Sequence, residues 1–298
     1  MRGRREAQSL VRLRTAALND LPFGISQYTT WTLPFAEDVL LCGKLGVKNI
    51  EVCEAKVSAV EPDYQLRMLR DSGLKVSSVQ PRYHSPFPNS LRKFPASPKE
   101  RMRRLRETIR LFGRYFPGTT LVVNTGVAPG GNFALAQRVA VREFGAAAQY
   151  AEDHGVRLAL ESLNPVYMNT DTFICSLRRA AEMVETVNHR AFGLFLDLWH
   201  FWEEPDAPKL IRDAAKIFGV HVSDWRRPRA FADRHLPGDG EIPIVDLLRT
   251  IRKAGYDGIY TLEVFSDLKL ADSLWKDPAR TVADGRASFR RIWRKTCA

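Results

Sequence analysis

The 298-residue chain contains no apolar run of the roughly 18 residues that a membrane-spanning helix requires. Its first residues, MRGRREAQSL, also lack the apolar core of a secretory signal. They are rich in arginine and poor in acids, which is typical of a solvated arm and leaves a mitochondrial presequence open. The four cysteines are scattered without a CxxC pair, which excludes a zinc ribbon or a disulfide-stabilised scaffold. We therefore expect free thiols and a cytoplasmic protein.

Acidic residues are in the minority, since 45 Lys and Arg against 34 Asp and Glu give a formal charge of +11. Most of the excess lies at the ends: residues 1–14 carry a net +4 and residues 286–298 a net +5, which leaves +2 for residues 15–285. Between Arg92 and Arg114 the arginines share a stretch with apolar residues at helical spacing, so we interpret them as the wet face of an amphipathic helix. Because no aromatic residues interleave with the basic ones there, a nucleic-acid partner is disfavoured.

Low-complexity segments and Ser/Gly/Pro-rich linkers are also absent, while a 45% hydrophobic content allows a sizeable core. Short apolar runs alternate with longer amphipathic ones along the chain. The runs predict strands at residues 23–28, 48–53, 75–80, 120–125, 156–163, 192–198, 218–223 and 258–265. The amphipathic stretches predict helices at residues 35–45, 63–72, 98–116, 132–154, 172–187, 207–217, 244–254 and 279–293.

Glycines mark several of the predicted turns from helix to strand. Gly46, Gly73, Gly155 and Gly255 each follow a predicted helix, where glycine supplies a left-handed C-cap. Eight strand–helix units in under 300 residues favour an α/β fold with a single (β/α)8 TIM barrel over residues 19–298, after a basic arm at residues 1–18 that we expect to be disordered. The alternative is a doubly wound open sheet, but residues 25–31 contain no glycine-rich phosphate loop.

Four consecutive predicted strands end in a chemically reactive side chain: Glu161, Asp197, His221 and Glu263. In a TIM barrel these ends meet at one mouth. Three carboxylates grouped there would repel one another and lose hydration unless a cation compensated for them. Three oxygen donors and one nitrogen suit Mn²⁺, Mg²⁺ or Co²⁺ at least as well as Zn²⁺. We therefore predict one divalent metal ion.

Further polar residues fall in the loops that follow these strands. His200 lies three residues after Asp197, and a polar loop before the predicted helix at 244–254 contains Asp233 and His235. Asp233 and His235 could bind a second metal or substrate, or brace the loop. Two residues with weaker signals are Arg227, six residues after His221, and His84, after the third strand; each is also consistent with an ordinary surface position.

Several motifs in a fixed order resemble the xylose-isomerase-like TIM-barrel superfamily of sugar phosphate isomerases and epimerases. They are LALES at 158–162, LDLWH at 196–200, GVHVSDWR at 219–226, LPGDGEIP at 236–243 and GYDGIYTLEVF at 255–265. This resemblance implies that Glu161, Asp197, His221 and Glu263 bind one catalytic metal ion. It also implies that Glu161 and Glu263 move protons and that His200 and Arg227 contact the substrate.

The resemblance implies a metal-dependent isomerase or epimerase that acts on a sugar, sugar phosphate or cyclitol through a metal-stabilised enediolate. Its small polyhydroxylated carbonyl substrate is the expected partner, and a homo-oligomer is left open. A dehydratase of the inosose or dehydroshikimate type is an alternative on the same site. An AP-endonuclease-like nuclease is an alternative of another class, disfavoured because the fourth strand ends in Asn124 and Thr125 without a histidine.

Overall fold

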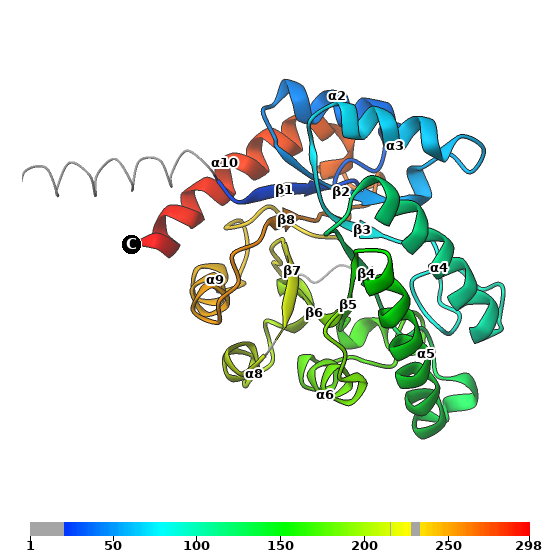
Figure 1. The fold of residues 1–298 in the computed structure, drawn as a ribbon. Coiled ribbons are helices and arrows are strands. Elements are labelled where there is room, and N and C mark those ends of the chain that lie inside the picture. The colour runs from blue at the N-terminus through cyan, green and yellow to red at the C-terminus, as the bar shows by residue number, and fades with distance from the viewer. Residues whose placement is uncertain (1–20, 215, 228–232) are drawn as a thin grey trace, which may run out of the picture.

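The computed structural model describes residues 21–214, 216–227 and 233–298, so the expectation for the arm at residues 1–18 lies outside the described residues. Within the described ranges, eight parallel strands form a closed barrel in sequence order, in which the last strand pairs with the first. The strands occupy the centre and the helices surround them (Figure 1). The predicted (β/α)8 barrel is confirmed.

All eight predicted strands are present, and several are shorter than predicted because their last residues already turn into loops at the mouth. The strands are β1 (Phe23–Ser26), β2 (Asn49–Cys53), β3 (Lys75–Gln80), β4 (Thr120–Val123), β5 (Arg157–Glu161), β6 (Phe192–Asp197), β7 (Ile217–Val222) and β8 (Tyr260–Leu262).

Nine α-helices lie in the described part of the chain, and none of them is both long and apolar enough to cross a bilayer. They are α2 (Phe35–Lys44), α3 (Pro62–Asp71), α4 (Pro98–Tyr115), α5 (Phe133–Asp153), α6 (Leu177–Val187), α7 (Leu198–Phe201), α8 (Ala207–Asp213), α9 (Ile244–Lys253) and α10 (Pro278–Cys297). Short 3-10 turns are η1 (Glu54–Lys56), η2 (Pro129–Gly131), η3 (Pro165–Tyr167) and η4 (Leu274–Lys276).

Three predicted helix boundaries were wrong, and one of them is the end of the last helix, which was predicted at residue 293 and lies at Cys297. The helix predicted from residue 172 begins only at Leu177, because the Ser176 side chain accepts a hydrogen bond from Arg179 N and caps it there. Thr172 instead forms a β-bridge with Gly126. The helix predicted over 207–217 ends at Asp213, and Ile217 already begins β7. The glycine C-caps were predicted correctly, since Gly46, Gly73, Gly155 and Gly255 all have positive φ.

One arginine of α4 departs from the predicted wet face. Arg101 is fully buried and donates hydrogen bonds to the carbonyl oxygens of Ser85 and Arg92, at 2.8 and 2.9 Å. Arg103, by contrast, is half exposed and pairs with Glu100 on the helix surface. Arg101 therefore anchors the segment between β3 and α4, which contributes to the barrel mouth described below.

The interior of the barrel is filled below the mouth by a small apolar cluster of Val122, Ala159 and Phe195, against which Phe218 packs. A Cβ at Gly219 would overlap the ring of Phe195, so only glycine fits at this point of β7. Phe195 in turn meets His221 edge-on, with the ring centroids 4.4 Å apart. The packed interior therefore supports the histidine from below.

The last helix packs over the junction between the first and last strands. α10 lies beside β1 (Figure 1), and the rings of Phe23 and Phe289 are 5.3 Å apart. Tyr260 of β8 and Trp293 of α10 are also buried in the same contact, with ring centroids at 5.2 Å. This packing joins the two ends of the described chain and completes the rigid scaffold under the mouth.

Candidate active site

The four predicted metal ligands meet at the carboxyl ends of β5 to β8. Glu161 and Asp197 are the last residues of β5 and β6, His221 lies on β7, and Glu263 follows β8. The ladder between β6 and β7 places Asp197 and His221 directly side by side. All four are buried, and the most exposed of them, Glu161, retains 7% of its surface.

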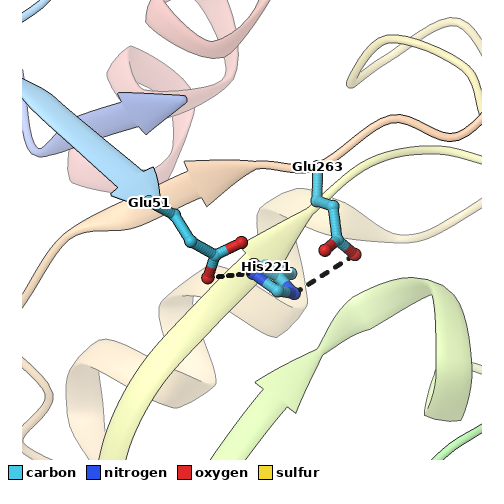
Figure 2. Close-up of side chains that lie close together, drawn as sticks. All are labelled: Glu51, His221 and Glu263. Atoms are coloured by element: carbon cyan, nitrogen blue, oxygen red, sulfur yellow. Dashed lines mark hydrogen bonds and ion pairs between the residues drawn. The ribbon is translucent and has the colours of Figure 1, made fainter. Parts of the chain in front are cut away.

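Three carboxylates face the same nitrogen of His221. Nδ1 lies 3.3 Å from Glu161 Oε1, 3.3 Å from Glu263 Oε2 and 3.8 Å from Asp197 Oδ2 (Figure 2 shows the contact with Glu263). Neither His221 Nδ1 nor Glu161 Oε1 has a hydrogen-bond partner among the described residues. Donor atoms that share one divalent ion, with bonds of about 2.0–2.3 Å, lie roughly 3–3.5 Å from one another. The residues present therefore fit a divalent cation.

A buried arginine, which the sequence analysis did not identify, shares this cluster. Arg234 Nη1 donates to Asp197 Oδ2 at 2.7 Å and to Glu263 Oε2 at 2.9 Å. Its guanidinium lies 5.1 Å from the ring of Trp199 and 5.0 Å from that of Phe265, so both rings hold its plane by cation–π contacts. Its position between Asp233 and His235, the two loop residues that were predicted instead, was the available sequence signal.

The pKa values of the cluster reflect burial and mutual charge. Burial raises the pKa of Glu263 to about 8 and also raises the pKa of Glu161. Burial opposes ionisation of Asp197 too, but Arg234 and His200 outweigh it and hold the pKa of Asp197 well below its ordinary value. When all three carboxylates are ionised, Arg234 compensates one of them, and a divalent cation would neutralise the two charges that remain.

A fourth buried acid touches the cluster from the opposite wall. Glu51 Oε2 on β2 lies 2.8 Å from His221 Nε2, so that the imidazole lies between two glutamates (Figure 2). The Ser78 hydroxyl donates to the same Glu51 oxygen at 2.6 Å. Glu51 was not among the predicted site residues, because it does not lie at the end of a predicted strand. The available signal was an acid in the middle of the otherwise buried run at 48–53.

A cavity of about 210 Å³ opens above these residues. Aromatic and aliphatic side chains form much of its wall, and polar groups from several loops converge on it. The apolar lining consists of Tyr28, Leu91, Leu163, Tyr167 and Phe265, and the polar lining consists of Gln80, His84, Ser90, Asn124, Glu161, Asp171, His200, Arg234 and Glu263. A concave site that combines an apolar wall with convergent polar groups is typical of small-molecule binding.

His200 and His84, two of the residues predicted to contact the substrate, both line the cavity. His200 Nδ1 accepts a hydrogen bond from Asn164 N at 3.1 Å, which directs Nε2 towards Asp197 Oδ2 at 3.5 Å. The two ring nitrogens of His84 lie 2.9 Å from Pro81 O and 2.9 Å from Asn89 Nδ2. Burial lowers the pKa of His84. His84 thus contributes shape to the cavity wall, with both nitrogens held by protein groups.

Asn124, which the sequence analysis noted only because it is not a histidine, also faces the cavity. It directly follows β4, and its Oδ1 atom is buried without a hydrogen-bond partner among the described residues. An unsatisfied amide oxygen at a cavity wall is suited to accept a hydrogen bond from a ligand hydroxyl.

Three further predicted residues, Arg227, Asp233 and His235, do not line the cavity in the described structure. Arg227 is 78% exposed and pairs with Glu241 at 3.2 Å. Asp233 accepts a hydrogen bond from Ser266, and the backbone of His235 pairs with Asp224. The described groups able to hold a metal are Glu51–His221–Glu263 and Glu161–Asp197–His200, and neither includes these three residues. Asp233 and His235 therefore belong to neither of these two groups, and the second metal site considered for them is not seen among the described residues.

The conformation of the LPGDGEIP segment at 236–243 is determined by its hydrogen bonds to Asp224. The Asp224 carboxylate accepts hydrogen bonds from the backbone N–H groups of Gly238, Gly240 and Ile242, at 2.8 to 3.0 Å. A Cβ at Gly240 would overlap this carboxylate and the Trp225 carbonyl oxygen. The motif thus folds the loop tightly around Asp224, and this fold holds the segment that carries Arg234.

Comparison with curated proteins finds partial matches. The chain is 32% identical over 121 residues to an inosose isomerase of Bacillus subtilis, a match that covers 39% of this chain and 42% of that protein. It is 31% identical over 132 residues to a 3-dehydroshikimate dehydratase of Pseudomonas putida, which covers 40% of this chain and 19% of that protein. The matched segments thus span less than half of each relative.

Solved structures match over nearly the full chain. A Sinorhizobium meliloti protein superimposes with a TM-score of 0.79 at 27% identity and covers 91% of this chain and 98% of its own. The IOLI protein, solved with a bound zinc atom, superimposes with a TM-score of 0.71 at 19% identity, and the match covers 90% of this chain and 97% of that protein. Residues 40–292 match the family described as xylose isomerase-like TIM barrel, and the chain belongs to this family.

Proposed function

We propose that this protein is a divalent-metal-dependent isomerase or epimerase of a small polyhydroxylated carbonyl compound, a sugar or a cyclitol. The observation that carries the proposal is the convergence of Glu161, Asp197 and Glu263 on Nδ1 of His221, below a cavity of about 210 Å³. The partial match to an inosose isomerase supports the substrate class.

Glu161, Asp197, His221 and Glu263 would hold the ion, which we propose to be Mn²⁺, Mg²⁺, Co²⁺ or Zn²⁺. When bound, such an ion polarises a carbonyl oxygen and makes the neighbouring C–H more acidic. Glu161 and Glu263 both line the cavity, so one carboxylate can remove this proton and the other can return it. Arg234 and His200 lie beside them with N–H groups able to stabilise the negative oxygen of an enediolate.

The cavity wall supports a small substrate without a phosphate group. Among the described lining residues, Arg234 is the one permanent cation, and Asp197 and Glu263 already engage it. A phosphate normally requires several free cations or backbone N–H groups. Asn124 and Gln80 offer amide groups to hydroxyls, while Tyr28 and Phe265 offer flat apolar faces to the C–H side of a ring.

A dehydratase is the second candidate, and the match to a 3-dehydroshikimate dehydratase favours it. Dehydration would begin with removal of the same proton and continue with loss of a hydroxyl group one carbon further along. The two reactions differ in their products, because dehydration creates a conjugated double bond that absorbs ultraviolet light whereas isomerisation and epimerisation do not.

The test is a panel of ketoses and keto-cyclitols, each with and without a phosphate group, incubated with the protein and Mn²⁺, Mg²⁺, Co²⁺ or Zn²⁺ and followed by proton NMR and ultraviolet absorbance. We expect metal-dependent conversion of at least one compound and none in excess EDTA. Conversion at full rate in EDTA would contradict the proposed metal dependence. Turnover confined to phosphorylated substrates would contradict the proposal that the substrate lacks a phosphate group.

A further inference from the structure

Glu51 and His221 form a buried hydrogen bond across the barrel. Glu51 Oε2 lies 2.8 Å from His221 Nε2, and both side chains have no exposed surface (Figure 2). A carboxylate only accepts hydrogen bonds, so Nε2 must carry the hydrogen. In the neutral imidazole this leaves the lone pair on Nδ1, the atom that faces Glu161, Asp197 and Glu263.

The surroundings hold Glu51 in place for this contact. Ser78 on the neighbouring strand β3 donates its hydroxyl hydrogen to Glu51 Oε2 at 2.6 Å. The edge-on ring of Phe195, 4.4 Å from the imidazole between centroids, restricts rotation of His221 from the other side. The hydrogen bond from Ser78 on β3 therefore fixes the orientation of Glu51, and Glu51 in turn orients His221 on β7.

We propose that Glu51 is the positioning residue that fixes the ring orientation of His221 and keeps a hydrogen on Nε2, so that Nδ1 is the nitrogen presented to an ion. The inference rests on the proposed metal site. Its physical basis is general: a carboxylate on the far nitrogen of a ligating histidine orients the ring and increases its basicity, and mutation of such a partner weakens metal binding by about 10- to 100-fold.

The contacts of Glu51 also define the competing role. Glu51, His221 and Glu263 each offer one atom within 4.8 Å of the others, so Glu51 would itself be a ligand if the ion lay on the Nε2 side of the imidazole. The positioning role places the ion on the Nδ1 side, where Glu161 Oε1 lacks a hydrogen-bond partner among the described residues. The two roles differ in whether Glu51 belongs to the coordination shell.

The experiment compares Glu51→Gln with the matched control Glu54→Gln. Glu54 is partly buried, and it accepts hydrogen bonds from Arg82 N and the Thr108 hydroxyl, outside the cluster. Each full-length variant is titrated with Co²⁺, and the visible d–d absorption reports both the dissociation constant and the ligand geometry. Circular dichroism and the melting temperature of the metal-free proteins report folding.

We expect Glu51→Gln to raise the Co²⁺ dissociation constant by about 10- to 100-fold, while the spectrum at saturation stays that of the wild type. Glu54→Gln should bind within about twofold of the wild type. Unchanged affinity in Glu51→Gln would overturn the inference, and so would a saturated spectrum that shows a lost ligand, which would make Glu51 part of the coordination shell. Failure of the wild type to bind Co²⁺ would instead overturn the proposed function.

Ser78→Ala keeps the test decisive if Glu51→Gln does not fold. This substitution leaves the carboxylate in place and removes the hydroxyl that orients it. We expect a several-fold weaker Co²⁺ affinity with an unchanged saturated spectrum. If Ser78→Ala binds as tightly as the wild type, Glu51 needs no external orientation and the proposed relay from β3 to His221 is wrong.

Discussion

Arg234 donates a hydrogen bond to Asp197 at 2.7 Å, inside the same cluster in which Asp197 faces His221 Nδ1. One carboxylate is thus shared between a permanent cation of the protein and the position proposed for a metal ion. Because Arg234 is fully buried between two aromatic rings, the orientation of its guanidinium group is fixed. The arginine therefore complements the proposed ion without replacing it, since one positive charge cannot balance three carboxylates.

The first prediction compares Arg234 with Arg227, the arginine that was predicted from the sequence to contact the substrate. Arg234→Gln leaves Asp197 and Glu263 buried without their cation, so the metal-free protein should lose about 3–5 kcal/mol of its free energy of unfolding. Saturating metal should restore part of this loss, because the added ion neutralises the same carboxylates. Urea unfolding with and without Mn²⁺ measures both effects.

Arg227→Gln is the matched control, because Arg227 is exposed and contacts Glu241 on the surface. Its unfolding free energy should change by less than about 0.5 kcal/mol, and its turnover should stay within about twofold of the wild type. A large loss of turnover in Arg227→Gln alone would instead support the substrate contact expected from the sequence, and would require the loop to move when substrate binds.

The second prediction concerns metal content. The purified protein should contain about one divalent ion per chain by elemental analysis, because oxygen atoms of Glu161, Asp197 and Glu263 all lie within 3.8 Å of His221 Nδ1. Dialysis against EDTA should abolish turnover and leave the far-ultraviolet circular dichroism intact, because the barrel core packs without an ion. Three ions per chain would favour the nuclease alternative, and undiminished turnover after removal of the metal would refute the site.

The barrel could be predicted from the sequence because its signals are local. Apolar runs, helical periodicity and glycine C-caps each depend on neighbouring residues. The convergence of the four strand-end side chains proposed as ligands follows once a parallel barrel is assumed. Arg234 and Glu51 were missed because their roles depend on long-range contacts. Arg234 comes from a loop and reaches β6, and Glu51 lies in mid-strand across the barrel from His221.

Errors at element boundaries have a similar origin. Residues 172–176 carry helical periodicity, but Thr172 pairs with Gly126 and its hydroxyl lies 2.9 Å from that of Thr125. These tertiary hydrogen bonds outweigh local helix propensity. Arg101 likewise sits on a helix whose other arginines suggested a solvated face, and only the loop that it anchors explains its burial.

The third prediction tests the packing below His221. Gly219→Ala places a methyl group against the Phe195 ring, so it should lower the free energy of unfolding by about 1–3 kcal/mol. Because Phe195 supports His221, the metal affinity should fall as well. Gly145→Ala is the control, since Gly145 lies within α5 with open space around it, and alanine there should stabilise the protein by up to about 1 kcal/mol.

The fourth prediction concerns the thiols. Burial raises the pKa of Cys42 to about 12 and that of Cys53 to about 11, so at pH 8 both carry less thiolate than an ordinary cysteine. Cys297 is exposed. Alkylation of the native protein with iodoacetamide, followed by peptide mass spectrometry, should modify Cys297 first and leave Cys42 and Cys53 unmodified until the protein is denatured. Early labelling of Cys42 or Cys53 would show that β2 and α2 open readily.

The last prediction addresses the proton transfer at Glu263. Removal of a proton next to the carbonyl is common to isomerisation, epimerisation and dehydration, so turnover in deuterated water should place deuterium at that carbon whenever the carboxyl group exchanges before it returns the proton. Glu263→Gln keeps an oxygen donor but removes a base, and turnover should fall by about a hundredfold or more. Glu54→Gln, which neutralises a carboxylate outside the cluster, should retain most of the activity.

A lost ion would imitate a lost base, because Glu263 is proposed to serve in both roles. Turnover of Glu263→Gln must therefore be measured over a full Mn²⁺ titration, with the bound metal determined in the same samples. At saturation the variant should remain slow and should fail to introduce deuterium into recovered substrate. If the metal-loaded variant turned over as fast as the wild type, Glu263 could not be the base, and Glu161 or transfer of a hydride between adjacent carbons would have to take its place.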